Sequence, residues 1–103
     1  MYKKLVRDNI PDIIKANGEI PVVEVLSDND YKKELEKKLF EECQEVLDST
    51  GIDRIEELAD LLEVMISLAE LENKTFYDII ELREDKKSKR GGFSKRLFLK
   101  GVN

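Results

Sequence analysis

Two apolar stripes at helical spacing, separated by a short turn, limit most strongly what this chain can fold into. Between residues 28 and 49, and again between residues 53 and 72, apolar side chains recur at the three- and four-residue spacing of one helix face. The stripe residues are Tyr31, Leu35, Leu39 and Val46 in the first segment and Leu61, Val64, Leu68 and Leu71 in the second. The sequence therefore predicts two long helices that run antiparallel and pack through these faces.

The second of these segments is apolar on two sides. Its other flank is formed by Ile55, Leu58, Leu62, Met65, Ile66 and Ala69. A helix with two apolar faces needs two packing partners, and a chain of 103 residues forms one domain with only a modest core. We therefore expect a single domain over residues 1–103 that self-association completes, as a homodimer or a homotetramer.

Capping and turn residues place the ends of the helices. Pro11 and the pair Asn17-Gly18 predict a short helix over residues 8–17. Ser27 or Asp28 supplies the N-cap of the first long helix, because a Ser or Asp side chain accepts a hydrogen bond from a free backbone amide of the first turn.

The same signals continue along the chain. Gly51 is expected to end the first long helix, and Asp53 with Glu56 forms a capping pattern that begins the second. Thr75 with Asp78 repeats this pattern for a last helix, which is expected to run to about Arg90.

Two short segments have the composition of β-strands. Residues 20–26, IPVVEVL, are β-branched and bounded by turn residues, and residues 96–102, RLFLKGV, follow the break at Gly91-Gly92. The predicted fold class is therefore mainly α, an antiparallel helical bundle with a minor β element made by these two segments.

Four acidic residues occur on or beside the apolar stripes. Glu42 falls near the centre of the first stripe and Glu45 at its edge, while Glu57 begins the second stripe and Asp60 lies beside it. An ionised carboxylate is costly to bury without a partner, so four of them together require a compensating cation. The alternative is that these acids are surface charges at helical spacing by chance, with Lys38 pairing with Glu42 four residues on.

The residue types limit which cation fits. Carboxylates are hard oxygen ligands that suit Mg²⁺, or Mn²⁺. A di-iron bundle site requires His ligands and a zinc site requires His or Cys, whereas this chain has no His and one cysteine, Cys43. We expect Cys43 to be a small core residue.

Charge and composition exclude other classes of function. The net charge of −5 argues against a nucleic-acid binder, because phosphate contacts need a basic excess. No stretch is long and apolar enough for a membrane span or a signal peptide, which predicts a cytoplasmic protein with no membrane partner. The absence of His also removes the usual general base, and no glycine-rich phosphate loop is present.

Several motifs together resemble one enzyme family. The segments EECQE and ELAD resemble the acidic motifs of the MazG-like, all-α nucleoside triphosphate pyrophosphatases. The opening KLVRDNIPDIIKANG and the closing KKSKRGGFSKRLFL resemble a small single-domain branch described as house-cleaning enzymes for non-standard nucleotides. The resemblance covers nearly the whole chain.

The resemblance implies an enzyme that hydrolyses a nucleoside triphosphate, or its deoxy form, to the monophosphate and pyrophosphate. Carried over by position, Glu42, Glu45, Glu57 and Asp60 are metal ligands for Mg²⁺, and Glu41 is an accessory that orients water beside Glu42. Metal-activated water would then be the nucleophile.

Basic and aromatic residues are the candidates for substrate contact. Lys38 lies one helical turn from Glu42, so it could reach a phosphate or simply pair with that acid. Arg7 and Arg90 stand out as motif-like in the resemblance, and Phe93 could stack on a base. A helix end followed by a core aromatic is the favoured explanation of Arg90 and Phe93.

Two other functions stay open at this point. Phosphoribosyl-ATP pyrophosphohydrolases form a sister group that reads DLLYH where this chain reads DLLEV. A non-catalytic helical interaction module, with the acids as plain surface charges, is the alternative outside the enzymes.

Overall fold

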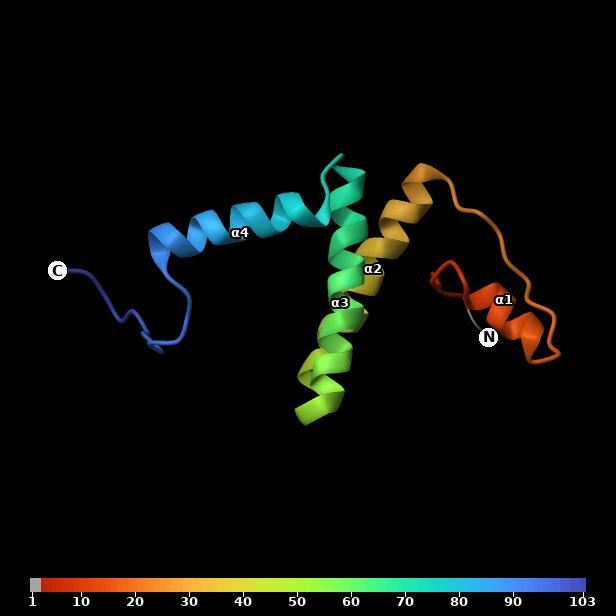
Figure 1. The fold of residues 1–103 in the computed structure, drawn as a ribbon, viewed down its shortest axis with the longest axis horizontal. Coiled ribbons are helices and arrows are strands. Elements are labelled where there is room, and N and C mark those ends of the chain that lie inside the picture. The colour runs from red at the N-terminus through yellow and green to blue at the C-terminus, as the bar shows by residue number, and fades with distance from the viewer. Residues whose placement is uncertain (1–2) are drawn as a thin grey trace.

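The computed structural model describes residues 3–103 and contains four helices in this range (Figure 1). They are α1 (Ile10–Ala16), α2 (Asp28–Leu47), α3 (Gly51–Leu71) and α4 (Phe76–Arg90). The prediction of a mainly helical fold is confirmed. Within residues 3–103 no strand forms, so the predicted minor β element is wrong.

Helices α2 and α3 form an antiparallel hairpin, and the small core lies between them (Figure 1). Leu35 of α2 and Val64 of α3 are buried, with 3% and 5% of their surface exposed. Both residues belong to the predicted apolar stripes, which confirms the helical phase. The Ser27 hydroxyl accepts a hydrogen bond from the Asp30 amide and caps α2 as expected.

The connection between α2 and α3 lies about two residues earlier in the chain than predicted. Gly51 has a φ of +62° and is the first residue of α3, so it begins this helix instead of ending α2. A left-handed backbone at glycine costs little and lets the chain reverse directly into the next helix. The prediction that α3 begins at Asp53 is therefore wrong, and Asp53 and Glu56 lie inside its first two turns. The Arg54 side chain closes the turn by donating to the Val46 and Ser49 carbonyls.

The two outer helices follow their sequence signals. Pro11 lies in the first turn of α1, and Gly18, with a φ of +85°, follows its end. At the start of α4, Thr75 and Asp78 form a capping box in which each side chain accepts from the other residue's backbone amide. Gly91 ends α4 with a φ of +80°.

The two predicted strands are extended but unpaired. Residues 20–26 connect α1 to α2, whereas residues 96–102 follow α4 at the opposite end of the molecule (Figure 1). Their apolar side chains face solvent, and Val22 and Phe98 are 97% and 86% exposed. A strand needs a neighbouring backbone for its hydrogen bonds, and one copy of the chain does not bring these two segments together.

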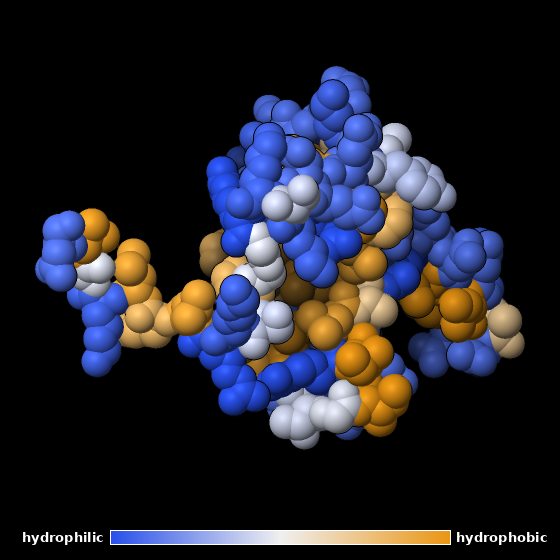
Figure 2. Space-filling model, turned by 60° about the vertical axis from the view of Figure 1, so that its left-hand side comes forward, coloured by the Kyte–Doolittle hydropathy of each residue, from blue (hydrophilic) through white to orange (hydrophobic). Residues whose placement is uncertain are grey.

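The single chain leaves much of its apolar surface open. Its extents are 63 × 33 × 23 Å and its radius of gyration is 17.9 Å, against about 13 Å for a compact domain of this length. Helix α4 points away from the hairpin, and Figure 2 shows apolar side chains spread over the face in view. On the second flank of α3, Ile55, Leu58, Leu62 and Met65 are exposed, whereas Ile66 and Ala69 are half-buried. Cys43 is also exposed, so its expected place in the core is wrong for the single chain.

None of the helices over residues 3–103 combines the length and the apolar character that crossing a membrane requires.

Candidate metal centre

Three of the four predicted metal ligands come together on the α2–α3 hairpin. Glu42 of α2 and Glu57 and Asp60 of α3 each offer a carboxylate oxygen, and these oxygens lie within 4.8 Å of one another. Glu57 and Asp60 are three residues apart and so project from the same side of α3, toward the α2 face that carries Glu42. We call these three residues the acidic trio.

The acidic trio is half-buried, which makes its negative charge costly. Only 14% of the Glu42 side chain is exposed. Burial raises the pKa of the Glu57 carboxyl above its ordinary value, and the charges of Glu45, Asp60, Glu42 and Glu56 raise this pKa further. Each cause disfavours the ionised form, so a cation among these groups would relieve the repulsion.

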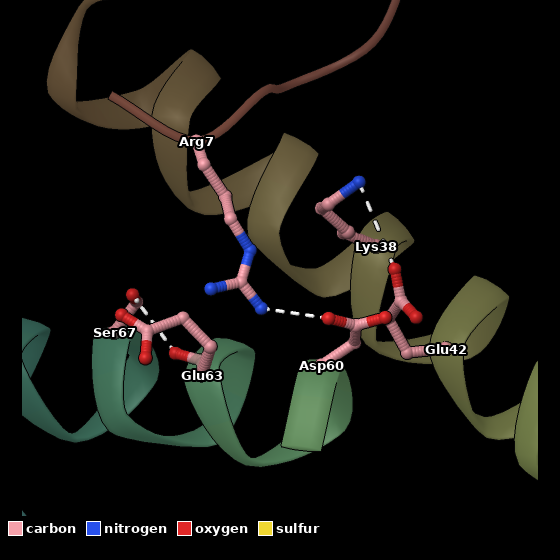
Figure 3. Close-up of polar contacts among 6 residues, drawn as sticks. All are labelled: Arg7, Lys38, Glu42, Asp60, Glu63 and Ser67. Atoms are coloured by element: carbon pink, nitrogen blue, oxygen red, sulfur yellow. Dashed lines mark hydrogen bonds and ion pairs between the residues drawn. The ribbon is translucent and has the colours of Figure 1, made fainter. Parts of the chain in front are cut away.

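Two side-chain cations contact the acidic trio (Figure 3). Lys38 of α2 places its Nζ 3.8 Å from Glu42 Oε1, one turn along the same helix. Arg7, from the segment before α1, donates from Nη2 to Asp60 Oδ1 at 2.7 Å. These two contacts neutralise part of the charge, and within residues 3–103 neither of them nor any other ion pair involves Glu57.

The donor set fits a hard divalent ion. An octahedral Mg²⁺ holds its oxygens at about 2.0–2.1 Å, so two ligands of one ion lie at most about 4.2 Å apart. The acidic trio spans at most 4.8 Å, so small side-chain rotations close it around an ion of this size. Three carboxylates in place of nitrogen or sulfur donors favour Mg²⁺ or Mn²⁺ over zinc or copper.

The other predicted acids lie outside the acidic trio. Glu45 is exposed on α2, although its charge is the largest electrostatic influence on the pKa of Glu57. Glu41 is exposed and precedes Glu42 by one position, which turns it about 100° around α2. Neither residue belongs to the group of carboxylates that meet within 4.8 Å.

The predicted basic and aromatic residues divide into two groups. Lys38 and Arg7 contact the acidic trio directly. Arg90 is the last residue of α4 and Phe93 follows the helix, and together with Lys95 and Arg96 they line a hollow of about 400 Å³. Phe93 is 98% exposed, so its predicted alternative as a core aromatic is wrong for the single chain.

Sequence reasoning did not find the partner of Arg7. Helical phase relates residues on one helix or on adjacent helices, whereas Arg7 and Asp60 are 53 residues apart. The resemblance singled out Arg7 as motif-like, but nothing in the spacing pointed to Asp60 as its acceptor. Figure 3 also shows Ser67 donating to the Glu63 carbonyl, which is an ordinary bond within α3.

Comparison with known proteins gives one partial relative. A protein of Mycolicibacterium smegmatis, named only as an uncharacterized protein, is 49% identical over 43 residues. The matched region is 42% of this chain and 44% of that protein, so the chain spans less than half of the relative it matches. No family model matches the chain. No solved structure matches it either.

Proposed function

We propose that this protein is a Mg²⁺-dependent nucleoside triphosphate pyrophosphohydrolase that acts on non-standard ribo- or deoxyribonucleotides. The observation that carries the proposal is the convergence of Glu42, Glu57 and Asp60 from two helices within 4.8 Å. The resemblance of the EECQE and ELAD segments to the MazG-like pyrophosphatases supplies the reaction. Mn²⁺ is the expected substitute for Mg²⁺.

The acidic trio would hold the ion, and Glu45 would add a fourth carboxylate by rotation of its exposed side chain. A divalent ion at this place supplies charge neutralisation for the phosphates and a more acidic water as the nucleophile. Glu41, beside Glu42 and open to solvent, would orient that water. Lys38, at 3.8 Å from Glu42, is within reach of a phosphate oxygen after a small movement of its flexible side chain.

The products follow from the site of attack. Water that adds to the α phosphorus breaks its bond to the bridging oxygen, and the β and γ phosphates leave together as pyrophosphate. The chain has no His and no glycine-rich phosphate loop, so recognition of the triphosphate falls to the metal ion and to Lys and Arg side chains.

The active form would be a homodimer or homotetramer. The second flank of α3 is apolar and partly exposed, and the segment after α4 exposes Leu97, Phe98 and Leu99. Burying such side chains against a second copy stabilises by about 25 cal/mol for each Å² of apolar surface removed from water. A second copy offers the missing half of a helical bundle, and we expect the protein to act in the cytoplasm in this form.

Product analysis tests the reaction. The protein is incubated with Mg²⁺ and a panel of ordinary, deaminated and oxidised nucleoside triphosphates plus phosphoribosyl-ATP, and products are separated by ion-exchange chromatography. We expect monophosphate and pyrophosphate from the wild type and none from Glu42→Gln. Glu70→Gln, an exposed acid on the same hairpin, is the matched control and should retain activity.

A non-catalytic interaction module is the second candidate. The observation that favours it is the large number of exposed apolar side chains, which any binding partner could cover. This candidate predicts that no nucleotide in the panel is cleaved and that Glu42→Gln behaves like the wild type. Cleavage of phosphoribosyl-ATP in preference to the triphosphates would instead indicate the sister group.

A further inference from the structure

Arg7 is brought to the acidic trio from a separate part of the chain. It precedes α1, and within residues 3–103 the backbone of α1 does not come within packing distance of another helix. The 2.7 Å contact from Arg7 Nη2 to Asp60 Oδ1 therefore links the N-terminal segment to the α2–α3 hairpin (Figure 3). The positive charge of the guanidinium reduces the electrostatic repulsion among the crowded carboxylates at this place.

The contact is short but open to water. The side chains of Arg7 and Asp60 are 55% and 46% exposed, and ion pairs this exposed contribute little to stability. A weak pair can be exchanged at little cost. Asp60 is also a member of the acidic trio, so a divalent ion that binds there competes with the guanidinium for the same carboxylate.

We propose that Arg7 changes partner: it pairs with Asp60 in the metal-free protein and contacts the triphosphate once a divalent ion holds Asp60. This inference rests on the proposed function and assigns Arg7 as a substrate-binding residue. Arg7 already lies against the acidic trio through its contact with Asp60, so a phosphate bound to the ion would be within reach of its flexible side chain. The planar guanidinium can donate two parallel hydrogen bonds to two oxygens of a phosphate. An ammonium group lacks this geometry.

The proposed change of partner by Arg7 predicts how this residue affects the affinity for a divalent ion in the absence of nucleotide. If Arg7 competes with the ion, then removing it must tighten binding, since coupling between two ligands of one site is reciprocal. We expect Arg7→Gln to bind Mn²⁺ about two- to fivefold more tightly than the wild type, which is the range of an exposed ion pair. Arg7→Lys keeps the charge and should bind Mn²⁺ close to the wild-type affinity.

Mn²⁺ titration followed by the electron paramagnetic resonance signal of the free ion measures this directly. Arg83→Gln is the control, because Arg83 is an exposed arginine of α4 whose contact with Glu84 is remote from the acidic trio. Circular dichroism checks that all variants keep their helix content. Equal or weaker Mn²⁺ binding by Arg7→Gln would overturn the exchange.

Steady-state kinetics tests the second half of the proposal. We expect both Arg7→Gln and Arg7→Lys to lose about tenfold or more in kcat/KM at saturating Mg²⁺, because both lack the planar guanidinium that holds phosphate. Unchanged kinetics in both variants, with an active wild type, would overturn the phosphate contact and leave the proposed function intact. A wild type that neither binds Mn²⁺ nor cleaves any nucleotide would overturn both.

Discussion

At Glu57, the stability of the fold and the proposed metal binding place opposite demands on one side chain. Its pKa is raised because the α2–α3 hairpin takes it partly out of water and surrounds it with carboxylates. A group whose charged form is disfavoured in the folded state lowers stability at neutral pH. Positions of this kind are kept in proteins when they serve a ligand, and stability usually improves when they are neutralised.

Glu57→Gln should therefore raise the melting temperature of the metal-free protein at pH 7. The amide keeps the shape of the carboxyl and removes the repulsion. Thermal unfolding in the presence of a chelator measures the effect, with Glu70→Gln, an exposed acid later on α3, as the control. A lower melting temperature for Glu57→Gln would mean that its carboxylate makes favourable contacts in the absence of metal.

The sequence predicted only part of the side-chain contacts at the acidic trio. The phase of α2 and α3 was sufficient to bring Glu42, Glu57 and Asp60 together, because helical geometry relates them locally. It did not distinguish Glu45, which lies at the edge of the stripe and remains exposed. The Arg7–Asp60 contact depends on the path of the chain through 53 residues, which no local pattern encodes.

Among the elements, the helices were predictable and the strands were not. Periodicity and capping residues are local, so α1, α4 and the start of α2 agree with their signals. A strand forms only when a second backbone supplies hydrogen bonds, and residues 20–26 and 96–102 have no such neighbour here. The predicted start of α3 was wrong because the helix begins at Gly51, which has a left-handed backbone, two residues before the capping pattern at Asp53.

Helix α4 depends on its cap more than the hairpin helices do, because few residues pack against it. Thr75→Ala should cost about 1 kcal/mol by removing the side chain that accepts from the Asp78 amide. We expect a smaller helical signal at 222 nm and earlier loss of that signal on heating. An unchanged melting profile would show that the capping box does not limit the stability of α4.

The same cap predicts a pH dependence. Hydrogen bonds from the Thr75 amide and hydroxyl lower the pKa of the Asp78 carboxyl below its ordinary value of 3.8. The stabilisation is therefore fully present above the unfolded value and is lost as the pH falls through the folded one. Asp78→Asn should be less stable than the wild type at pH 6, and the difference should shrink toward pH 3. A difference that stays constant over this range would contradict the assignment.

The single chain is extended and leaves many apolar side chains exposed to solvent. The radius of gyration of 17.9 Å is larger than the value of about 13 Å for a compact domain of this length. Among residues 3–103 only Leu35 and Val64 are buried, which is a small core for an independently stable domain. The second apolar flank of α3 is the surface that self-association would cover. The sequence already pointed to this flank, because its apolar positions follow a second helical stripe.

Leu62→Lys should therefore shift the protein toward monomer. It places a charge in the middle of the partly exposed second flank of α3, where burial against a second copy would be costly. Sedimentation velocity should give twice or four times the mass of one chain for the wild type and a lower mass for the variant. Glu70→Lys, on the polar side of α3, is the control, and a monomeric wild type would contradict the expectation.

If the acidic trio of Glu42, Glu57 and Asp60 holds a divalent ion, the melting temperature of the protein must rise with the Mg²⁺ concentration, and thermal unfolding measures this rise. At tenfold the dissociation constant, an ion that binds only the folded state stabilises by about 1.4 kcal/mol. For a domain of this length that is a rise of about 6–11 °C. We expect this rise for the wild type and Glu70→Gln, and its loss in Glu42→Gln and Glu57→Gln. No rise in the wild type, or an equal rise in the two trio variants, would mean that the acidic trio does not hold the ion.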